Sequence, residues 1–144
     1  MAMVREILQK KGSQVWSIGT GATVLQAALL MNEHHIGGLV VIDQGRVAGM
    51  MTERDVLRLV AERRDPAATT VGEMMTSEVF CCSPLTPLDE AKSAMKNHRV
   101  RHIPVVSDGD RLEGVISIGD LNAHETADHE QTIFLMSEYI YGRV

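Results

Sequence analysis

The stretch Gly49-Met50-Met51-Thr52-Glu53-Arg54-Asp55 recurs later in the chain as Gly114-Val115-Ile116-Ser117-Ile118-Gly119-Asp120. Each copy reads glycine, two apolar residues, a hydroxyl residue, two variable residues and an aspartate, and each follows an apolar run and opens a helix-like segment. The hydroxyl and the carboxylate are therefore expected where a strand passes into a helix N-terminus. Free N–H groups and the positive end of the helix dipole favour a phosphate there.

Helix capping is the simpler explanation of either copy taken alone. Thr52 and Ser117 are then N-cap residues, and Asp55 and Asp120 are their capping-box partners. The duplication is what makes a binding role a serious alternative, because a carboxylate at this place can accept two hydrogen bonds from a sugar diol.

Composition restricts the class of protein. The chain has 144 residues, 44% of them hydrophobic, so it can bury a core and is not of the disordered type. The net charge of −5 and the lack of a long basic run argue against nucleic-acid binding. The first residues lack the apolar run of a signal peptide, and no apolar stretch is long enough for a membrane span, so we expect a soluble cytoplasmic protein.

Periodicity predicts the elements of the first half. The expected elements are a helix over 4–10, a strand over 15–18, a helix from a Thr23–Gln26 capping box to about His34, paired strands over 39–42 and 47–51, and a helix over 53–64.

The second half repeats this order. The expected elements are a short helix over 71–75 capped by Thr70 with Glu73, a strand over 79–82, a helix over 88–98, strands over 103–106 and 112–116, and a helix that begins near Asp120.

The two halves align at a nearly fixed offset. Gly45 pairs with Gly109 at 64 residues, and Asp55 pairs with Asp120 at 65 residues after one inserted residue in the second turn. We therefore expect a mixed α/β (α+β) fold with repeat 1 over 1–64, a linker over 65–70, repeat 2 over 71–125 and a helical tail over 126–144. Neither half can bury its sheet alone, so the halves should pack face to face with a ligand cleft between them.

The motifs as a set resemble a tandem pair of CBS domains, also called a Bateman module. The matching stretches are Ser83-Pro84-Leu85-Thr86-Pro87-Leu88-Asp89-Glu90-Ala91, His102-Ile103-Pro104-Val105-Val106 and the two Gly-x-x-[Thr/Ser]-x-x-Asp copies. The resemblance covers about Val4 to Asn122 and is strongest to small stand-alone bacterial CBS proteins. It implies two β-α-β-β-α repeats packed sheet to sheet, which bind AMP, ADP, ATP, NAD(H) or S-adenosylmethionine as sensors, for example of energy state, rather than as catalysts.

The resemblance also implies roles for particular residues. Asp55 and Asp120 would hold ribose hydroxyls, and Thr52 and Ser117 would hold phosphate. Further residues are expected to line the cleft or the base pocket: Ile18, Gly19, Thr20, Met50, Met51, Cys82, Ser83, Val115 and Ile116.

The two predicted sites differ in their basic residues. Repeat 2 carries Arg101-His102, which we predict to contact phosphate, where repeat 1 has Gly37-Gly38. Repeat 1 instead has Arg54 inside its motif, where either a bidentate phosphate contact or a solvent-exposed ion pair fits.

Other readings remain open. The six histidines have no metal-ligand spacing, and we find no nucleophile–base pair and no Walker loop, so neither a metal nor a catalytic residue is predicted. The adjacent Cys81 and Cys82 are expected to be a buried or cleft-lining thiol rather than a redox pair, because neighbours on a strand point to opposite faces. A dimeric scaffold with vestigial sites, or a small nucleotide-dependent enzyme, is the alternative.

The tail has an apolar helical stripe of Ile133, Met136 and Ile140. Such a face must dock on its own chain or on a second copy. CBS pairs commonly form a flat disk of four repeats, so the resemblance implies a homodimer, acting on an unidentified downstream protein.

Overall fold

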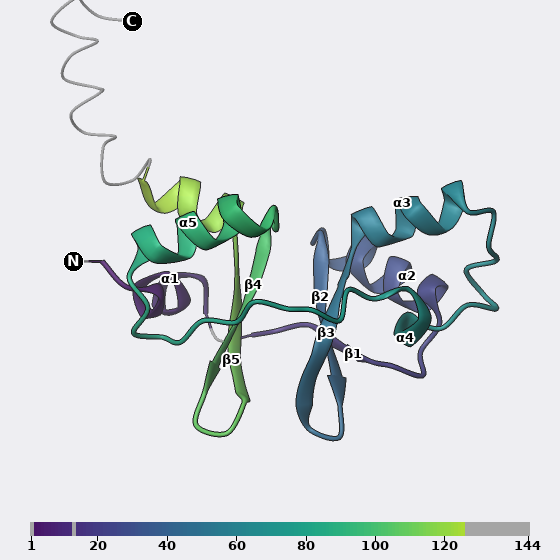
Figure 1. The fold of residues 1–144 in the computed structure, drawn as a ribbon, viewed down its shortest axis with the longest axis horizontal. Helices are drawn as coiled ribbons and strands as arrows, with labels where there is room; N and C mark the ends of the chain where they lie inside the picture. The colour runs from purple at the N-terminus through teal and green to yellow at the C-terminus, as the bar shows by residue number, and fades with distance from the viewer. Residues whose placement is uncertain (1, 13, 126–144) are drawn as a thin grey trace, which may run out of the picture.

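The computed structural model describes residues 2–12 and 14–125, so the expected tail helix lies outside the described residues. Two compact halves lie side by side, with the sheets in the middle and the helices on the outer sides (Figure 1). The elements are α1 (Val4–Lys11), β1 (Ser17–Gly19), α2 (Val24–His34), β2 (Gly38–Asp43), β3 (Arg46–Thr52), α3 (Glu53–Ala61), α4 (Val71–Met74), α5 (Leu88–His98), β4 (His102–Ser107) and β5 (Arg111–Ser117). Residues 118–125 continue β5 as a helix.

The two sheets share one hairpin geometry. β2 pairs antiparallel with β3, and β4 pairs antiparallel with β5. The register shifts between Val41 and Ile42 in the first hairpin and between Val105 and Val106 in the second, which are equivalent positions at an offset of 64. The inserted residue of the second turn therefore does not disturb the pairing, and the predicted repeat is confirmed in three dimensions.

Repeat 2 lacks the first strand that the sequence predicts over 79–82. Repeat 1 has β1 parallel to β2, whereas the equivalent segment of repeat 2 makes a single parallel bridge from Cys82 to Val105. Cys82 still donates its N–H to the carbonyl of Pro104 and accepts from the N–H of Val106. Pro84 follows two residues later and has no N–H to extend a strand, so the pairing stops there.

The short helices are exchanged between the sequence repeats. α1 opens repeat 1 in the chain, but its buried Val4 and Ile7 belong to the core formed by α5, β4 and β5. α4 opens repeat 2 in the chain, but its Val71 and Met74 belong to the core of α2, β2, β3 and α3. Each spatial half therefore borrows one helix from the other repeat, which ties the halves together.

The repeated motif glycines let these borrowed segments approach the sheets. A Cβ on Gly49 would lie 2.5 Å from the carbonyl oxygen of Thr76, and a Cβ on Gly114 would lie 2.7 Å from Cδ2 of Leu8. Both distances are too short for a real side chain. The glycine is thus a packing requirement at Gly49, where the neighbour is backbone, whereas at Gly114 the end of the Leu8 side chain must shift.

Within the described residues, no helix is long and apolar enough to cross a membrane.

Candidate functional site

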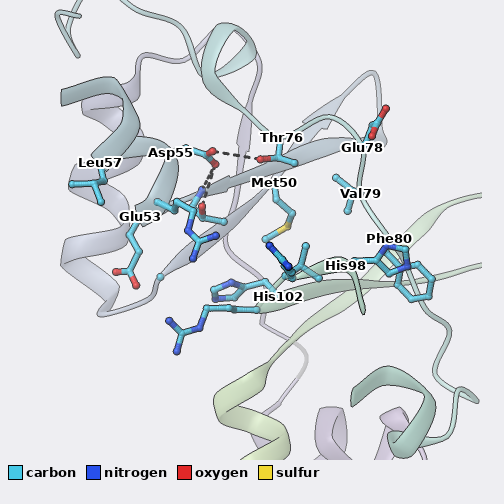
Figure 2. Close-up of a pocket in the computed structure, with 16 residues that line it drawn as sticks. Met50, Glu53, Asp55, Leu57, Thr76, Glu78, Val79, Phe80, His98 and His102 are labelled. Atoms are coloured by element: carbon cyan, nitrogen blue, oxygen red, sulfur yellow. Dashed lines mark hydrogen bonds between the residues drawn. The ribbon is translucent and has the colours of Figure 1, made fainter. Parts of the chain in front are cut away.

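A cavity of about 550 Å³ opens between the two repeats beside the first motif copy. Figure 2 shows the side chains that line it. Its volume lies in the range of small-molecule sites. The lining residues come from the β2 and β3 ends, the α3 N-terminus, the segment after α4, and the α5–β4 connection: Gly37, Met50, Thr52, Glu53, Arg54, Asp55, Leu57, Thr76, Glu78, Val79, Phe80, His98, Arg99, Val100, Arg101 and His102.

Asp55 forms the buried acidic end of this cavity. It is the third residue of α3, and its side chain is only 6% exposed. Oδ2 accepts a 2.9 Å hydrogen bond from the Thr52 N–H and a 3.2 Å bond from the Thr52 hydroxyl. The capping geometry predicted for this motif is therefore present, and it fixes the carboxylate in one orientation.

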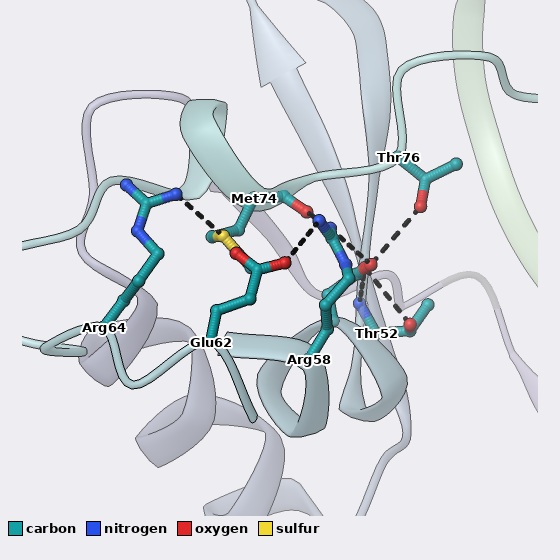
Figure 3. A network of polar contacts seen from close by, with 7 residues as sticks. Thr52, Arg58, Glu62, Arg64, Met74 and Thr76 are labelled. Atoms are coloured by element: carbon teal, nitrogen blue, oxygen red, sulfur yellow. Dashed lines mark hydrogen bonds and ion pairs between the residues drawn. The ribbon is translucent and has the colours of Figure 1, made fainter. Parts of the chain in front are cut away.

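The other carboxylate oxygen of Asp55 is held weakly. Oδ1 lies 3.4 Å from Arg58 Nη2 and 3.4 Å from the Thr76 hydroxyl, both at the outer limit of a hydrogen bond. Arg58 makes its short contact elsewhere, donating to the carbonyl of Met74 at 2.6 Å, as Figure 3 shows. The Oδ1 atom thus keeps acceptor capacity, in a residue that lines the cavity.

Sequence reasoning missed Arg58 and Thr76. The signal for Arg58 was its i+3 spacing from Asp55 on a helix, which predicts an ion pair. The contact of Thr76 was harder to predict from the sequence. Thr76 reaches Asp55 only because the segment after α4 pairs with Met50 through two backbone hydrogen bonds of 2.9 and 3.0 Å.

The basic side of the cavity combines both repeats. Arg54 comes from α3, Arg101 comes from the residue before β4, and both are exposed at the cavity. His102 is the first residue of β4 and is half-buried. Burial lowers the pKa of its imidazole below the ordinary value of 6.5, opposed by the nearby carboxylates of Glu53 and Asp120. The ring is therefore mainly neutral at pH 7 until an anion approaches it.

An apolar wall completes the cavity. Met50, Val79, Phe80 and Val100 line it. The Phe80 ring stacks on His98, with ring centroids 5.1 Å apart and an interplanar angle of 23°. The cavity thus offers a carboxylate, a set of cations and an apolar surface to a single ligand.

The second motif copy has the same cap but a different neighbour. Asp120 accepts from the Ser117 N–H at 2.8 Å through Oδ2, and the Asp120 N–H donates to the Ser117 hydroxyl at 3.0 Å. Lys11 Nζ lies 2.8 Å from the same Oδ2 and donates to the Val115 carbonyl at 2.8 Å. The carboxylate of Asp120 is therefore already paired with a cation from α1.

Several residues predicted to line the cleft are not among those that line this cavity. Met51 and Ile116 are fully buried in the cores of their repeats, Cys82 is buried in the second core, and Ile18 packs against the first. Thr20 accepts a hydrogen bond from Gly72, Gly19 is the exposed end of β1, and Ser83 lines a separate hollow with Asp108 and Asp110. Successive side chains of a strand point to opposite faces of the sheet. Because Met50 lines the cavity from β3, the side chain of Met51 points into the core instead.

The cysteines are not poised for thiolate chemistry. Burial raises the pKa of the Cys82 thiol to about 12, and burial followed by the charge of Asp110 raises the pKa of Cys81. Both thiols therefore stay protonated near neutral pH, which disfavours nucleophilic or redox use. Among residues 2–12 and 14–125, no three His, Cys, Asp or Glu side chains group as a candidate metal site.

Comparison with known proteins gives a consistent result. The CBS domain family model matches residues 4–62 and 71–127. The CBS domain-containing protein YhcV of Bacillus subtilis is 35% identical over 117 residues, covering 81% of this chain and 82% of YhcV. The structure of a putative signal-transduction protein with CBS domains from Burkholderia ambifaria is 40% identical with a TM-score of 0.83, covering 88% of this chain and 96% of that one. A CBS domain protein from Pyrobaculum aerophilum, solved in complex with AMP, is 27% identical with a TM-score of 0.75, covering 83% and 89%.

Proposed function

Because the chain belongs to the CBS-domain family and contains two CBS repeats, we propose that the cavity beside Asp55 binds an adenosine nucleotide of the AMP, ATP or NAD(H) class. The protein then acts as a regulatory sensor in the cytoplasm, with no catalysis of its own. The observation that carries the proposal is a buried, oriented carboxylate and several cations in one cavity of nucleotide size. The AMP complex of the related Pyrobaculum protein supports the ligand class.

The ribose is assigned to Asp55. Its Oδ2 is used by the cap, whereas Oδ1 has only two contacts of 3.4 Å. Ribose hydroxyls that approach Oδ1 replace these long contacts with charge-assisted hydrogen bonds in a partly desolvated cavity, where such bonds are stronger than neutral ones. The cap and the ligand role are thus compatible, because they use different oxygens.

The phosphate is assigned to the basic side of the cavity. Thr52 offers its hydroxyl, and Arg54, Arg101 and His102 offer cationic or titratable donors from two directions. Two guanidinium groups can each bind phosphate bidentately. The base is assigned to the apolar wall at Met50, Val79 and Phe80, with Phe80 able to stack on a purine.

A second copy of the chain is the proposed partner in assembly. The outer helices of repeat 1 expose Leu25, Leu29, Leu57 and Val60. The equivalent positions of repeat 2 are the polar Asp89, Ser93, Asn122 and Glu125. We therefore place the homodimer contact on α2 and α3, since exposed apolar side chains of this size favour burial. A downstream protein would read the nucleotide-dependent state.

A thermal-shift screen with AMP, ATP, NAD, NADH and S-adenosylmethionine tests the proposal, because a ligand that binds only the folded state raises the melting temperature. Calorimetric titration and mass spectrometry of the denatured protein then identify bound ligand and stoichiometry. We expect at least one adenosine nucleotide to stabilise the protein and to bind without turnover. A scaffold with vestigial sites gives no shift with any of the five, and turnover of the bound nucleotide indicates an enzyme.

A further inference from the structure

The two motif carboxylates differ in how closely a cation approaches them. Asp55 has no contact to a cation shorter than 3.4 Å among the described residues, whereas Asp120 forms a 2.8 Å ion pair with Lys11. Lys11 is anchored by a second bond of 2.8 Å to the carbonyl of Val115, a residue of the same motif copy. The ammonium group thus lies on Oδ2, the oxygen that also accepts the Ser117 N–H, and it pairs the charge of the second carboxylate.

The exchanged helices explain why a lysine reaches this place. Val4 of α1 and Val71 of α4 are both fully buried and begin equivalent helices at an offset of 67. At the same offset, Leu8 approaches Gly114 as Met75 approaches Gly49. The offset pairs Lys11 with Glu78, which lines the cavity beside Asp55.

The equivalent helices α1 and α4 differ in length. α4 ends at Met74, so the chain after it runs extended past the first cavity through Thr76, Glu78 and Phe80. α1 is twice as long, with 8 residues against 4, and its last turn carries Lys11 onto Asp120. The extra turn therefore places a cation at the second carboxylate, where the first copy has an open cavity.

We propose that Lys11 is an internal occupant of the Asp120 site and determines which of the two sites binds nucleotide. This inference rests on the proposed function of the Asp55 cavity. The Asp55 site is open, whereas a ribose at Asp120 meets a carboxylate whose charge is already paired with the Lys11 ammonium, so that binding there competes with this ion pair. Both side chains of the pair are partly exposed, at 35% and 24%, so the occupant can be displaced at high ligand concentration.

Calorimetric titration of AMP into wild type, Lys11→Met, Lys10→Met and Lys11→Met/Asp120→Ala tests the role of Lys11. Methionine keeps an apolar stem of similar length and removes the charge. Lys10 is the exposed neighbouring lysine and serves as the matched control. We expect wild type and Lys10→Met to bind one AMP tightly per chain. In Lys11→Met a second AMP should bind, with an affinity about tenfold higher than that of the second site in wild type. The double variant should return to one.

The outcomes separate this inference from the proposed function. One equivalent for both wild type and Lys11→Met overturns the role of Lys11 and leaves the Asp55 site standing. Two AMP molecules bound per wild-type chain, with weaker binding of the second in Lys11→Met, also overturn the role of Lys11, because Lys11 then holds the ligand phosphate. No binding to wild type with one Asp120-dependent equivalent in Lys11→Met supports the role of Lys11 and contradicts the Asp55 site. Circular dichroism of each variant establishes that it is folded.

Discussion

The imidazole of His102 packs on the backbone of Gly38, the residue that holds the same position in the other repeat. Three ring atoms lie 3.3 to 3.4 Å from the point that a Cβ on Gly38 would take. Equivalent residues of two repeats touch only where they face each other across the pseudo-two-fold axis. Only one of the two positions can then carry a large side chain, which explains why His102 is matched by Gly38.

Replacing Gly38 by valine should therefore destabilise the protein through His102. We expect a loss of about 1–3 kcal/mol in unfolding free energy, the usual range for overpacking. The loss should shrink in a His102→Ala background, because the ring that meets the new side chain is gone. Urea unfolding of the four proteins measures this coupling. Equal losses in both backgrounds would show that the contact does not limit position 38.

The motif glycines should respond unequally to alanine. At Gly49 the new Cβ meets the backbone carbonyl of Thr76, which is fixed by pairing with Met50, whereas at Gly114 it meets the end of the flexible Leu8 side chain. We expect Gly49→Ala to cost about 1–3 kcal/mol and Gly114→Ala clearly less. Chemical denaturation of both variants checks the order. A larger loss at Gly114 would contradict the stated contacts.

Protonation of His102 should reduce stability at acid pH. Burial lowers the pKa of His102 in the folded state, so the unfolded chain binds more protons below about pH 6.5. The contribution of His102 to stability is therefore complete above that pH and decreases as the pH falls below it. Urea unfolding at pH 7.5 and 5.5 should show a smaller loss for His102→Asn than for wild type. An identical loss would remove His102 as the titrating group.

Association should depend on the outer helices of repeat 1. Leu29 is 60% exposed, and Ser93 is its equivalent in repeat 2. We expect Leu29→Glu to convert a dimer to a monomer and Ser93→Glu to leave it unchanged, because only the first change puts a charge into a buried apolar contact. Light scattering after size-exclusion chromatography decides this. A dimer that survives Leu29→Glu places the interface elsewhere.

Much of the fold was predictable from the sequence because the repeat fixes it. The capping boxes at Thr23 and Thr70 and the full span of α5 appear as predicted, since caps and helical periodicity are local signals. The exchange of α1 and α4 was not predictable, because it depends on which core accepts Val4 and Val71 rather than on chain order.

The candidate site was predictable only where the motif itself forms it. Thr52, Arg54 and Asp55 of the first motif copy line one cavity. Arg101 and His102, which were predicted for a separate site of repeat 2, line the same cavity. Arg99, Val100 and the segment around Thr76 were missed, because only the tertiary packing brings them to Asp55. The difference between Asp55 and Asp120 was missed for the same reason, since Lys11 and Asp120 are 109 residues apart in the chain.

The most direct test of the nucleotide site is a calorimetric cycle on Asp55. AMP and its 2′,3′-dideoxy analogue are titrated into wild type and Asp55→Ala, with circular dichroism to verify folding, because the variant also loses the contacts to Thr52. We predict that the substitution and the analogue each weaken binding about ten- to a hundredfold, or about 1.5–3 kcal/mol, and that together they cost little more than either alone. Equal binding of AMP and the dideoxy analogue to wild type, with affinity unchanged in Asp55→Ala, would leave Asp55 as a helix cap alone.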